Sequence, residues 1–360
     1  MSRITAGLMF FLSFFLSLRL NSGTSTSETG KRPDFVPDKP DGTGTAIIMT
    51  GAAARITQQA ALLEELYNRG LLNEVVFISG VSAGAINAVA LNAILEGKLT
   101  WDEYKKTLFS LENNDVFTLH DNKKLPVNTE PVRKLFTQFF EEKLGYKRMG
   151  DLPVMTEISF TNYRDIRLAK NVYRMCSRKI NKESDTTLSV VDVLMASTAI
   201  PFAFPPVRIE NVSTIPDLEY VDGGVGLDYV PFKALLEFQN YRGENVRKVY
   251  IISRKSGIAN VSEELKALGI NRKGMDMLGN SLDNILKRLM INRLTAFARE
   301  APEMIMSSYV WIPDFNQDFL MFSFNKLKEQ YTITKSWAQN NDPIPLGDFL
   351  LYNKMKKKKN

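Results

Sequence analysis

One serine flanked by glycines gives this sequence its clearest candidate for covalent chemistry. Ser82 lies in Gly80-Val81-Ser82-Ala83-Gly84, which has the G-x-S-x-G form of a nucleophile elbow. An elbow needs a strand that ends, a sharp turn and a helix that begins. Gly80 and Gly84 have no side chains, so neighbouring backbone can approach the turn closely. A serine hydroxyl also needs a nearby base to act as a nucleophile at neutral pH.

Two residues can be considered as that base. His120 is the single histidine of the 360-residue chain, and its polar surroundings are typical of an exposed loop. Its position before Asp222 is the reverse of the serine, acid, histidine order of α/β-hydrolases. Asp222 precedes Gly223 and Gly224, which leave its carboxylate uncrowded, although an Asp-Gly pair is also an ordinary turn signal. The residue types alone therefore leave the base open.

The segments around Ser82 predict the context that an elbow requires. Residues 74–79 are β-branched and aromatic, which is typical of a buried strand. Residues 85–95 are predominantly apolar and predict a packed helix. Ser82 would then lie at a helix N-terminus, where backbone N–H groups favour developing negative charge.

Four segments, in order, resemble the patatin-like phospholipase family. They are Gly51-Ala52-Ala53-Ala54-Arg55 with the following helix, the elbow from Gly80 to Asn87, Ala196-Ser197-Thr198-Ala199-Ile200-Pro201, and Asp222-Gly223-Gly224-Val225. The resemblance spans residues 45–235, and weaker similarity is expected to about residue 330. It implies that Ser82 is the nucleophile and Asp222 the base of a catalytic dyad without histidine. It also implies a serine lipid acyl hydrolase of the phospholipase A or lysophospholipase type, acting on phospholipid or another acyl lipid through an acyl-serine.

The loop expected to form the oxyanion hole departs from the family pattern. The family has G-G-G-x-R-G or G-G-G-x-K-G, whereas this chain has Gly51, Ala52, Ala53 and Arg55, with isoleucine at position 56. Oxyanion donors are backbone N–H groups, so alanine is chemically admissible. A glycine that uses positive φ is nevertheless costly to replace, because Cβ then meets the carbonyl. The alternative is a weakly active or inactive lipid-binding protein on the same fold.

Composition and charge indicate which surfaces, metals and cofactors the protein could bind. Hydrophobic residues make up 44% of the chain, enough for a large globular core, and the formal net charge is +6. That charge suits an anionic membrane surface, whereas no nucleic-acid-binding motif accompanies it. The lone Cys176 excludes an intrachain disulfide and is expected to be a buried, inert thiol. No Cys/His cluster has metal-ligand spacing, so we expect no metal and no cofactor.

The N-terminus resembles a targeting segment. Residues 1–22 have Arg3, an apolar centre and then small residues, which predicts a secretory signal peptide or a retained signal anchor. Residues 23–43 are rich in Ser, Thr, Gly, Pro and Asp and predict a flexible linker. We therefore expect a protein of the secretory pathway, either secreted or membrane-associated.

The remaining pattern predicts one catalytic domain over residues 44–345. Alternating strands and helices predict an α/β fold, a mostly parallel central sheet with helices on both faces. By the resemblance this is a patatin-like three-layer sandwich, with the helical region 100–150 as an inserted cap. Residues 274–300 carry apolar residues at helical spacing. The C-terminal segment 346–360 ends in a basic tail, which we expect to be unstructured.

Overall fold

The central strands of the domain are apolar on both faces because helices cover both sides of them. The computed structural model describes residues 44–120, 125–164, 172–201, 203–209, 218–225, 227–243, 246–255, 279–322 and 324–359. The expected signal segment and linker, residues 1–43, lie outside these ranges. No helix in the described ranges combines the length and the apolar character needed to cross a membrane.

Nine strands in the described residues form one mixed sheet, in the order β5-β6-β3-β2-β1-β7-β8-β9, with β4 also paired to β3. The five from β3 to β8 are mutually parallel, and β4, β5, β6 and β9 are antiparallel to their neighbours. The bounds are β1 (Thr45–Met49), β2 (Val75–Val81), β3 (Met155–Asn162), β4 (Val172–Cys176), β5 (Val207–Arg208), β6 (Glu219–Asp222), β7 (Lys248–Ile252), β8 (Ser308–Trp311) and β9 (Ile344–Pro345).

Alternate residues of the strands enter two separate cores. In β1, Ile47 and Met49 join one apolar cluster and Ala46 and Ile48 join the other. This period of two follows from the pleat, which points successive side chains to opposite faces. Both faces are apolar, so the strand is continuously hydrophobic, as its sequence indicated.

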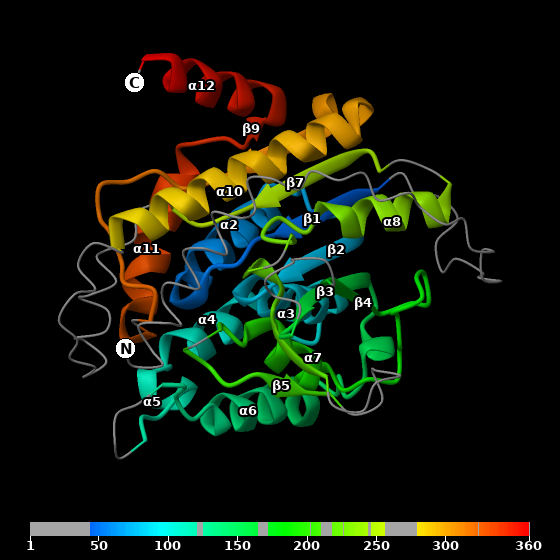
Figure 1. The fold of residues 1–360 in the computed structure, drawn as a ribbon, viewed down its shortest axis with the longest axis vertical. Helices are drawn as coiled ribbons and strands as arrows, with labels where there is room; N and C mark the ends of the chain where they lie inside the picture. The colour runs from blue at the N-terminus through cyan, green and yellow to red at the C-terminus, as the bar shows by residue number, and fades with distance from the viewer. Residues whose placement is uncertain are drawn as a thin grey trace.

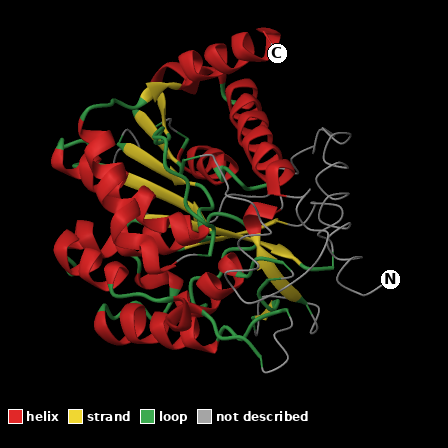
Figure 2. Cartoon of the chain, turned by 90° about the vertical axis from the view of Figure 1, so that its left-hand side faces the viewer, coloured by secondary structure: helices red, strands yellow, loops and turns green. Residues whose placement is uncertain are grey.

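Helices cover each face of the sheet (Figures 1 and 2). The first face is packed by α2 (Ile56–Asn68), α3 (Ala83–Glu96), α4 (Trp101–Phe109), α6 (Glu130–Phe136), α7 (Val190–Thr198) and α11 (Leu327–Gln339). The second is packed by α8 (Phe232–Arg242), α10 (Gly279–Glu300) and α12 (Leu346–Lys359). The short turns are η1 (Ala53–Arg55), η3 (Met149–Asp151), η4 (Gly223–Val225), η5 (Pro302–Ser307) and η6 (Phe324–Lys326). The expected three-layer α/β sandwich is confirmed.

The region expected to be a helical cap is helical. It contains α4, α5 (Asn113–Val116), α6 and the π-helical continuation η2 (Thr137–Lys143). Thr100 and Glu103 form a capping box that starts α4, and each supplies a side chain to the other's backbone N–H. Aromatic residues of α6 and η2 are buried in the first core, and both elements contact α7.

Two element ends differ from the sequence-based prediction. Strand β2 continues through Gly80 and Val81 because both residues pair with β3, at Ile158 and Ser159. The strand thus reaches the residue next to Ser82, and α3 begins at Ala83. At the C-terminus, α12 extends to Lys359 where an unstructured tail was expected. Its first turns are held by apolar packing, with Leu346 fully buried against the second core.

Candidate active site

Ser82 lies at the turn between β2 and α3, as the elbow pattern predicted. Its backbone has φ 57° and ψ −131°, a conformation that L-residues adopt only when their surroundings hold them there. The flanking glycines make this turn possible. A Cβ on Gly80 would lie 2.5 Å from the carbonyl oxygen of Gly84, and a Cβ on Gly84 would lie 2.6 Å from the carbonyl oxygen of Thr50. Only glycine permits these backbone contacts, which hold the strand, the helix and β1 together.

The pairing of β3 brings Ser82 and Asp222 together. Strand β4 pairs with Glu157–Thr161 of β3, so it occupies one edge. Strands β2 and β6 each pair with some of the same β3 residues that β4 pairs with. They must therefore both lie along the other edge of β3. Val81 pairs with Ser159, and Asp222 pairs with the next residue, Phe160. Since β2 is parallel and β6 antiparallel to β3, their C-terminal ends meet.

The Asp222 carboxylate is buried and lies in hydrogen-bond contact with the Ser82 side chain. Its Oδ1 also accepts a hydrogen bond of 2.7 Å from the Gly224 N–H, and its own N–H donates to the carbonyl of Ala199. Burial raises the pKa of Asp222 to about 6, and the hydrogen bonds from Ser82 and Gly224 limit that rise. Near pH 7 the carboxylate is thus mostly ionised but is a stronger base than an exposed aspartate.

Ser197 fixes the backbone of the elbow, a role that the sequence alone had not given it. Its Oγ accepts a hydrogen bond from the N–H of Ser82 at 2.9 Å and donates one to the carbonyl of Ser159 at 2.8 Å. This hydroxyl therefore connects α7, the end of β2 and the middle of β3. Ser197 lies in the segment that resembles the patatin family, so the motif had marked the region but could not indicate the contact.

A buried ion pair between Arg174 and Asp228 also stabilises β3 at Ser159. Asp228 accepts two hydrogen bonds from the Arg174 guanidinium, at 2.6 and 2.9 Å, and one from the Ser159 hydroxyl at 2.9 Å. Burial alone would raise the pKa of Asp228, but the charge and hydrogen bonds of Arg174 outweigh it and hold the pKa below its usual range. Sequence reasoning missed both residues, because their pairing joins β4 to the loop after the dyad segment.

The glycines after Asp222 serve different purposes. A Cβ on Gly223 would lie 2.7 Å from the Ser159 carbonyl carbon and oxygen, so this position requires glycine for close packing against β3. Gly224 supplies the N–H that binds the Asp222 carboxylate. Both glycines are buried in η4.

The expected oxyanion loop lies beside the serine. A Cβ on Gly51 would be 3.4 Å from the Ser82 Cβ, which places this glycine directly against the nucleophile candidate. Among the described residues, no acceptor is hydrogen-bonded to the N–H groups of Gly51, Ala52 or Ala53. By contrast, the Arg55 N–H donates to the Ala52 carbonyl, and the Arg55 guanidinium binds the carbonyl of Phe319. In this structure Arg55 therefore holds the loop, and its N–H is engaged inside the turn.

Ala53 has a strained backbone conformation, the cost that was expected for an alanine in place of a glycine in this loop. Its φ is +49°, in the left-handed region that costs a residue with a Cβ about 1–2 kcal/mol. Among the described residues, Ala53 and Ser82 are the two non-glycine residues with positive φ. Both residues lie in turns that line one apolar cavity. Ala53 thus has a backbone conformation that glycine would adopt at a lower cost.

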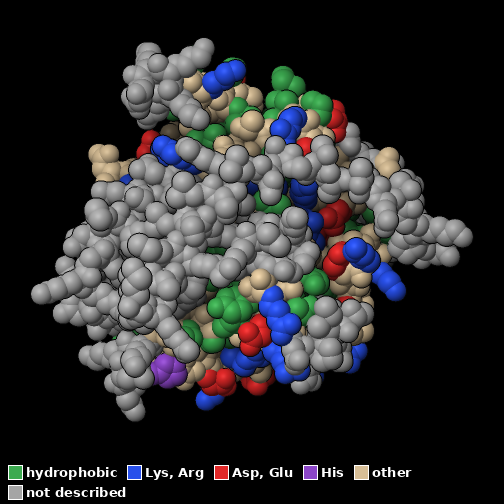
Figure 3. Space-filling model, viewed as in Figure 1, with side chains coloured by type: hydrophobic (Ala, Val, Ile, Leu, Met, Phe, Trp, Pro, Cys, Tyr) green, Lys and Arg blue, Asp and Glu red, His purple; other side chains and the backbone are tan. Residues whose placement is uncertain are grey.

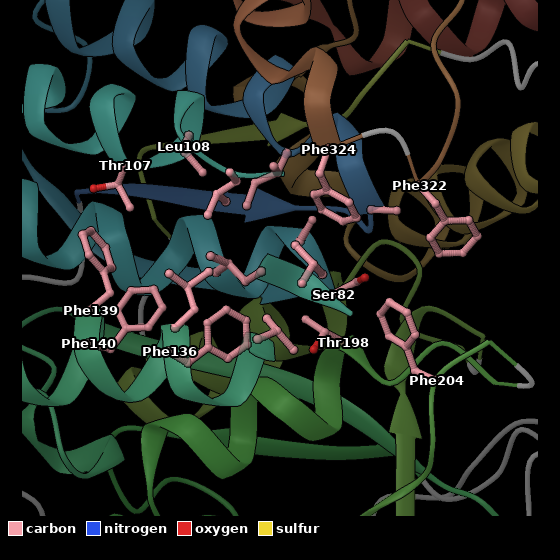
Figure 4. Close-up of a pocket in the computed structure, with 18 of the residues that line it drawn as sticks. Ser82, Thr107, Leu108, Phe136, Phe139, Phe140, Thr198, Phe204, Phe322 and Phe324 are labelled. Atoms are coloured by element: carbon pink, nitrogen blue, oxygen red, sulfur yellow. The ribbon is translucent and has the colours of Figure 1, made fainter. Parts of the chain in front are cut away.

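An apolar cavity opens at Ser82 and runs between α3, α4, α6 and η2 (Figure 4). The space between its walls is about 810 Å³, a volume that includes open solvent. Phe204 and Phe322 lie on one side of Ser82, and Leu108, Thr107 and Phe139 lie at the other end. Its other lining residues are mostly aliphatic or aromatic: Ala53, Ile56, Ala83, Ile86, Tyr104, Leu111, Val116, Val132, Leu135, Phe136, Phe140, Thr198, Ile200 and Phe324.

The remaining candidates lie outside this site. His120 is exposed on the surface, as expected for a loop histidine (Figure 3). Cys176 is a free, fully buried thiol, and burial raises its pKa well above the usual value. Within the described ranges, no three His, Cys, Asp or Glu side chains are grouped so that they could hold a metal ion.

Comparison with known proteins gives one strong match. The family model for patatin-like phospholipase matches residues 47–236, which is more than half of the chain and includes both Ser82 and Asp222. A search of curated proteins finds no match. Among solved structures, the chain is similar to VipD from Legionella pneumophila at 13% identity and a TM-score of 0.35, over 83% of this chain and 67% of VipD.

Replacing Ala53 by glycine is expected to raise the free energy of unfolding by about 0.5–1 kcal/mol. Relief of the left-handed alanine exceeds the greater freedom that glycine gains in the unfolded chain. Urea unfolding measures the change. The matched control is Ala54→Gly in the same turn, which has no positive φ to relieve and should lose stability. Equal losses in both variants would contradict the strained backbone at Ala53.

Proposed function

Because the chain belongs to the patatin-like phospholipase family, a family of lipid acyl hydrolases, we propose that it hydrolyses ester-linked fatty acids through a Ser82–Asp222 dyad. The observation that carries the proposal is the contact between a buried carboxylate and an elbow serine at the opening of an apolar cavity. The exposed position of His120 supports a base other than histidine. The phospholipase A or lysophospholipase type is part of the proposal.

In the first step, the Ser82 Oγ attacks the ester carbonyl carbon while Asp222 accepts the hydroxyl proton. A carbon–oxygen bond forms, and the carbonyl oxygen becomes an oxyanion. When the tetrahedral intermediate collapses, the ester bond breaks and the proton on Asp222 passes to the departing alkoxide. Water then attacks the acyl-serine, again giving a proton to Asp222, and the fatty acid is released as Ser82 regains its hydrogen.

The oxyanion needs fixed donors, which the loop and the helix can provide. We propose the N–H groups of Gly51, Ala52 and Ala53, which have no other acceptor among the described residues and lie beside Ser82. The N-terminus of α3 adds a favourable dipole at the same place. Arg55 is proposed to act indirectly, by anchoring the loop to Phe319. Each such donor is typically worth 10²–10³ in rate, so the geometry of this alanine-rich loop sets the level of activity.

The cavity supports an aliphatic substrate. Its lining consists almost entirely of hydrocarbon side chains, and its far end lies between α4 and η2, away from Ser82. An acyl chain bound there would place its carboxyl ester at the serine. The same cavity would also suit the alternative, a lipid-binding protein with little or no hydrolytic activity, so labelling of the serine has to separate the two.

A fluorophosphonate probe is expected to label the intact protein and to leave Ser82→Ala unlabelled. Asp222→Asn should react about 10²–10⁴ times more slowly, because the serine has lost its base. Labelling is followed by intact-mass spectrometry on samples whose unfolding midpoints have been checked. Absence of label on the intact, folded protein would contradict an active nucleophile and support the lipid-binding alternative.

The activity is expected to rise with pH and to level off above about pH 6. Asp222 accepts a proton only when ionised, and burial raises its pKa to about 6. Below that pH, kcat/KM for a soluble p-nitrophenyl ester should fall about tenfold per pH unit. A profile without an inflection between pH 5 and 7 would contradict Asp222 as the base.

The same pKa shift has a consequence for stability. Because the folded state favours protonated Asp222, its contribution is present below about pH 4 and is lost as pH rises through about 6. The Asp222→Asn side chain is neutral at every pH. At pH 7 the free energy of unfolding of this variant should therefore be up to about 3 kcal/mol higher than that of the unchanged protein. Urea unfolding at pH 4 and pH 7 measures the difference, which should vanish at the lower pH.

Thr107→Trp is expected to shift the preference towards shorter acyl chains. The added ring would occupy the far end of the cavity, and each methylene excluded from it costs about 0.8 kcal/mol, or about fourfold in kcat/KM. Esters from butyrate to palmitate test this, and butyrate should be unaffected. The matched control is Thr137→Trp, because Thr137 bonds the carbonyl four residues earlier just as Thr107 does but does not line the cavity. A uniform loss across all chain lengths would contradict the assignment.

A further inference from the structure

Exposed large hydrophobic side chains are concentrated at the C-terminal end of the molecule. Six such side chains occur in the described residues, and five of them belong to η5, β9 and α12. We call these five the C-terminal patch: Met306, Ile344, Leu351, Tyr352 and Met355. The three elements contact one another, so the side chains come from one part of the surface. The sixth, Tyr67, lies apart on α2 and packs edge-on against Trp101.

Helix α12 is apolar on two sides, which a helix with one buried face does not require. Leu346, Phe349 and Leu350 pack against the second core. Leu351 and Met355, four residues apart and therefore on one face, are 59% and 60% exposed. The outward side of such a helix is normally polar. The core thus explains one apolar side of α12 and leaves the other facing solvent.

Positive charge accompanies this patch. Segment 346–360 contains five lysines and one aspartate, a net +4 of the chain's +6. Lys354 is exposed between Leu351 and Met355, and four more lysines follow Met355 directly in the sequence. Figure 3 shows hydrophobic and basic side chains exposed along the upper edge of the molecule, where η5 and α12 lie in Figure 1.

We propose that the C-terminal patch docks this protein on the surface of an anionic lipid bilayer. Aliphatic and aromatic side chains would enter the headgroup boundary, and the net charge of +4 on segment 346–360 would attract the anionic lipids. A second copy of the chain fits less well, because a symmetric contact through this patch would bring two clusters of five lysines together. The docking does not depend on the proposed hydrolase activity.

The single buried thiol allows a direct test on the full chain. Leu351→Cys is labelled with an environment-sensitive dye such as NBD, which the fully buried Cys176 should not take up. Vesicles with 30% phosphatidylserine should shift the emission to the blue and increase it about twofold or more, whereas pure phosphatidylcholine vesicles should not. Tyr67→Cys carries the same dye as the matched control and should not respond, however the rest of the chain binds.

A charge variant completes the test. Lys354→Glu combined with Lys356→Glu should weaken the response of the Leu351→Cys label by tenfold or more in vesicle concentration, since each lysine contributes about fivefold near an anionic surface. Hydrolysis of the soluble p-nitrophenyl ester should stay unchanged, which separates failure of docking from failure of the proposed function. Equal responses at positions 351 and 67, or no preference for anionic vesicles, would overturn the proposal. A shift that grows with protein concentration without vesicles would overturn it in favour of self-association.

Discussion

The shared edge of β3 is the constraint on which the candidate site depends. Strands β2 and β6 meet there end to end, and their last residues pair with Ser159 and Phe160, which are neighbours in the chain. Ser82 and Asp222 are 140 positions apart in the sequence. This register nevertheless places them next to each other at the same edge of β3. A shift of either strand by one residue would turn one of the two side chains to the other face of the sheet.

The protein stabilises this meeting point with buried polar contacts centred on Ser159. Its carbonyl accepts a hydrogen bond from Ser197, which in turn holds the N–H of Ser82. Its hydroxyl binds Asp228, and Asp228 is paired with Arg174. Buried polar networks are costly unless every member has a partner. Here the network supports a serine and an aspartate that are themselves strained or poorly solvated, which is the arrangement that a pre-organised site requires.

The loop at Gly51–Arg55 holds a residue with a Cβ in a backbone conformation that favours glycine. Ala53 has a positive φ. Two hydrogen bonds hold the turn: the Ala54 N–H donates to the carbonyl of Met321, and the Arg55 guanidinium donates to the carbonyl of Phe319. These long-range contacts supply what glycine would otherwise give through its own conformational freedom. The methyl group of Ala53 lines the apolar cavity, and Ala52 is buried beside it in the chain.

Much of the fold could be predicted from local pattern. Continuous apolar runs marked β1 and β2, a G-x-S-x-G turn marked the elbow, and two glycines after Asp222 marked a close approach of backbone. These features depend on neighbours in the chain, so residue type and spacing carry them. The resemblance to a family then joined Ser82 to Asp222.

The contacts that hold the site together depend on register between strands distant in sequence. No local pattern indicates that Arg174 binds Asp228, that Ser197 bonds the elbow, or that Ala53 takes a left-handed conformation. The burial that raises the pKa of Asp222 is likewise a property of the packed chain, because desolvation depends on every element that surrounds the carboxylate. Spacing along the chain fixed which groups could react, and the pairing of β3 with β2 and β6 fixed where they meet, since only a folded sheet brings remote backbone into register.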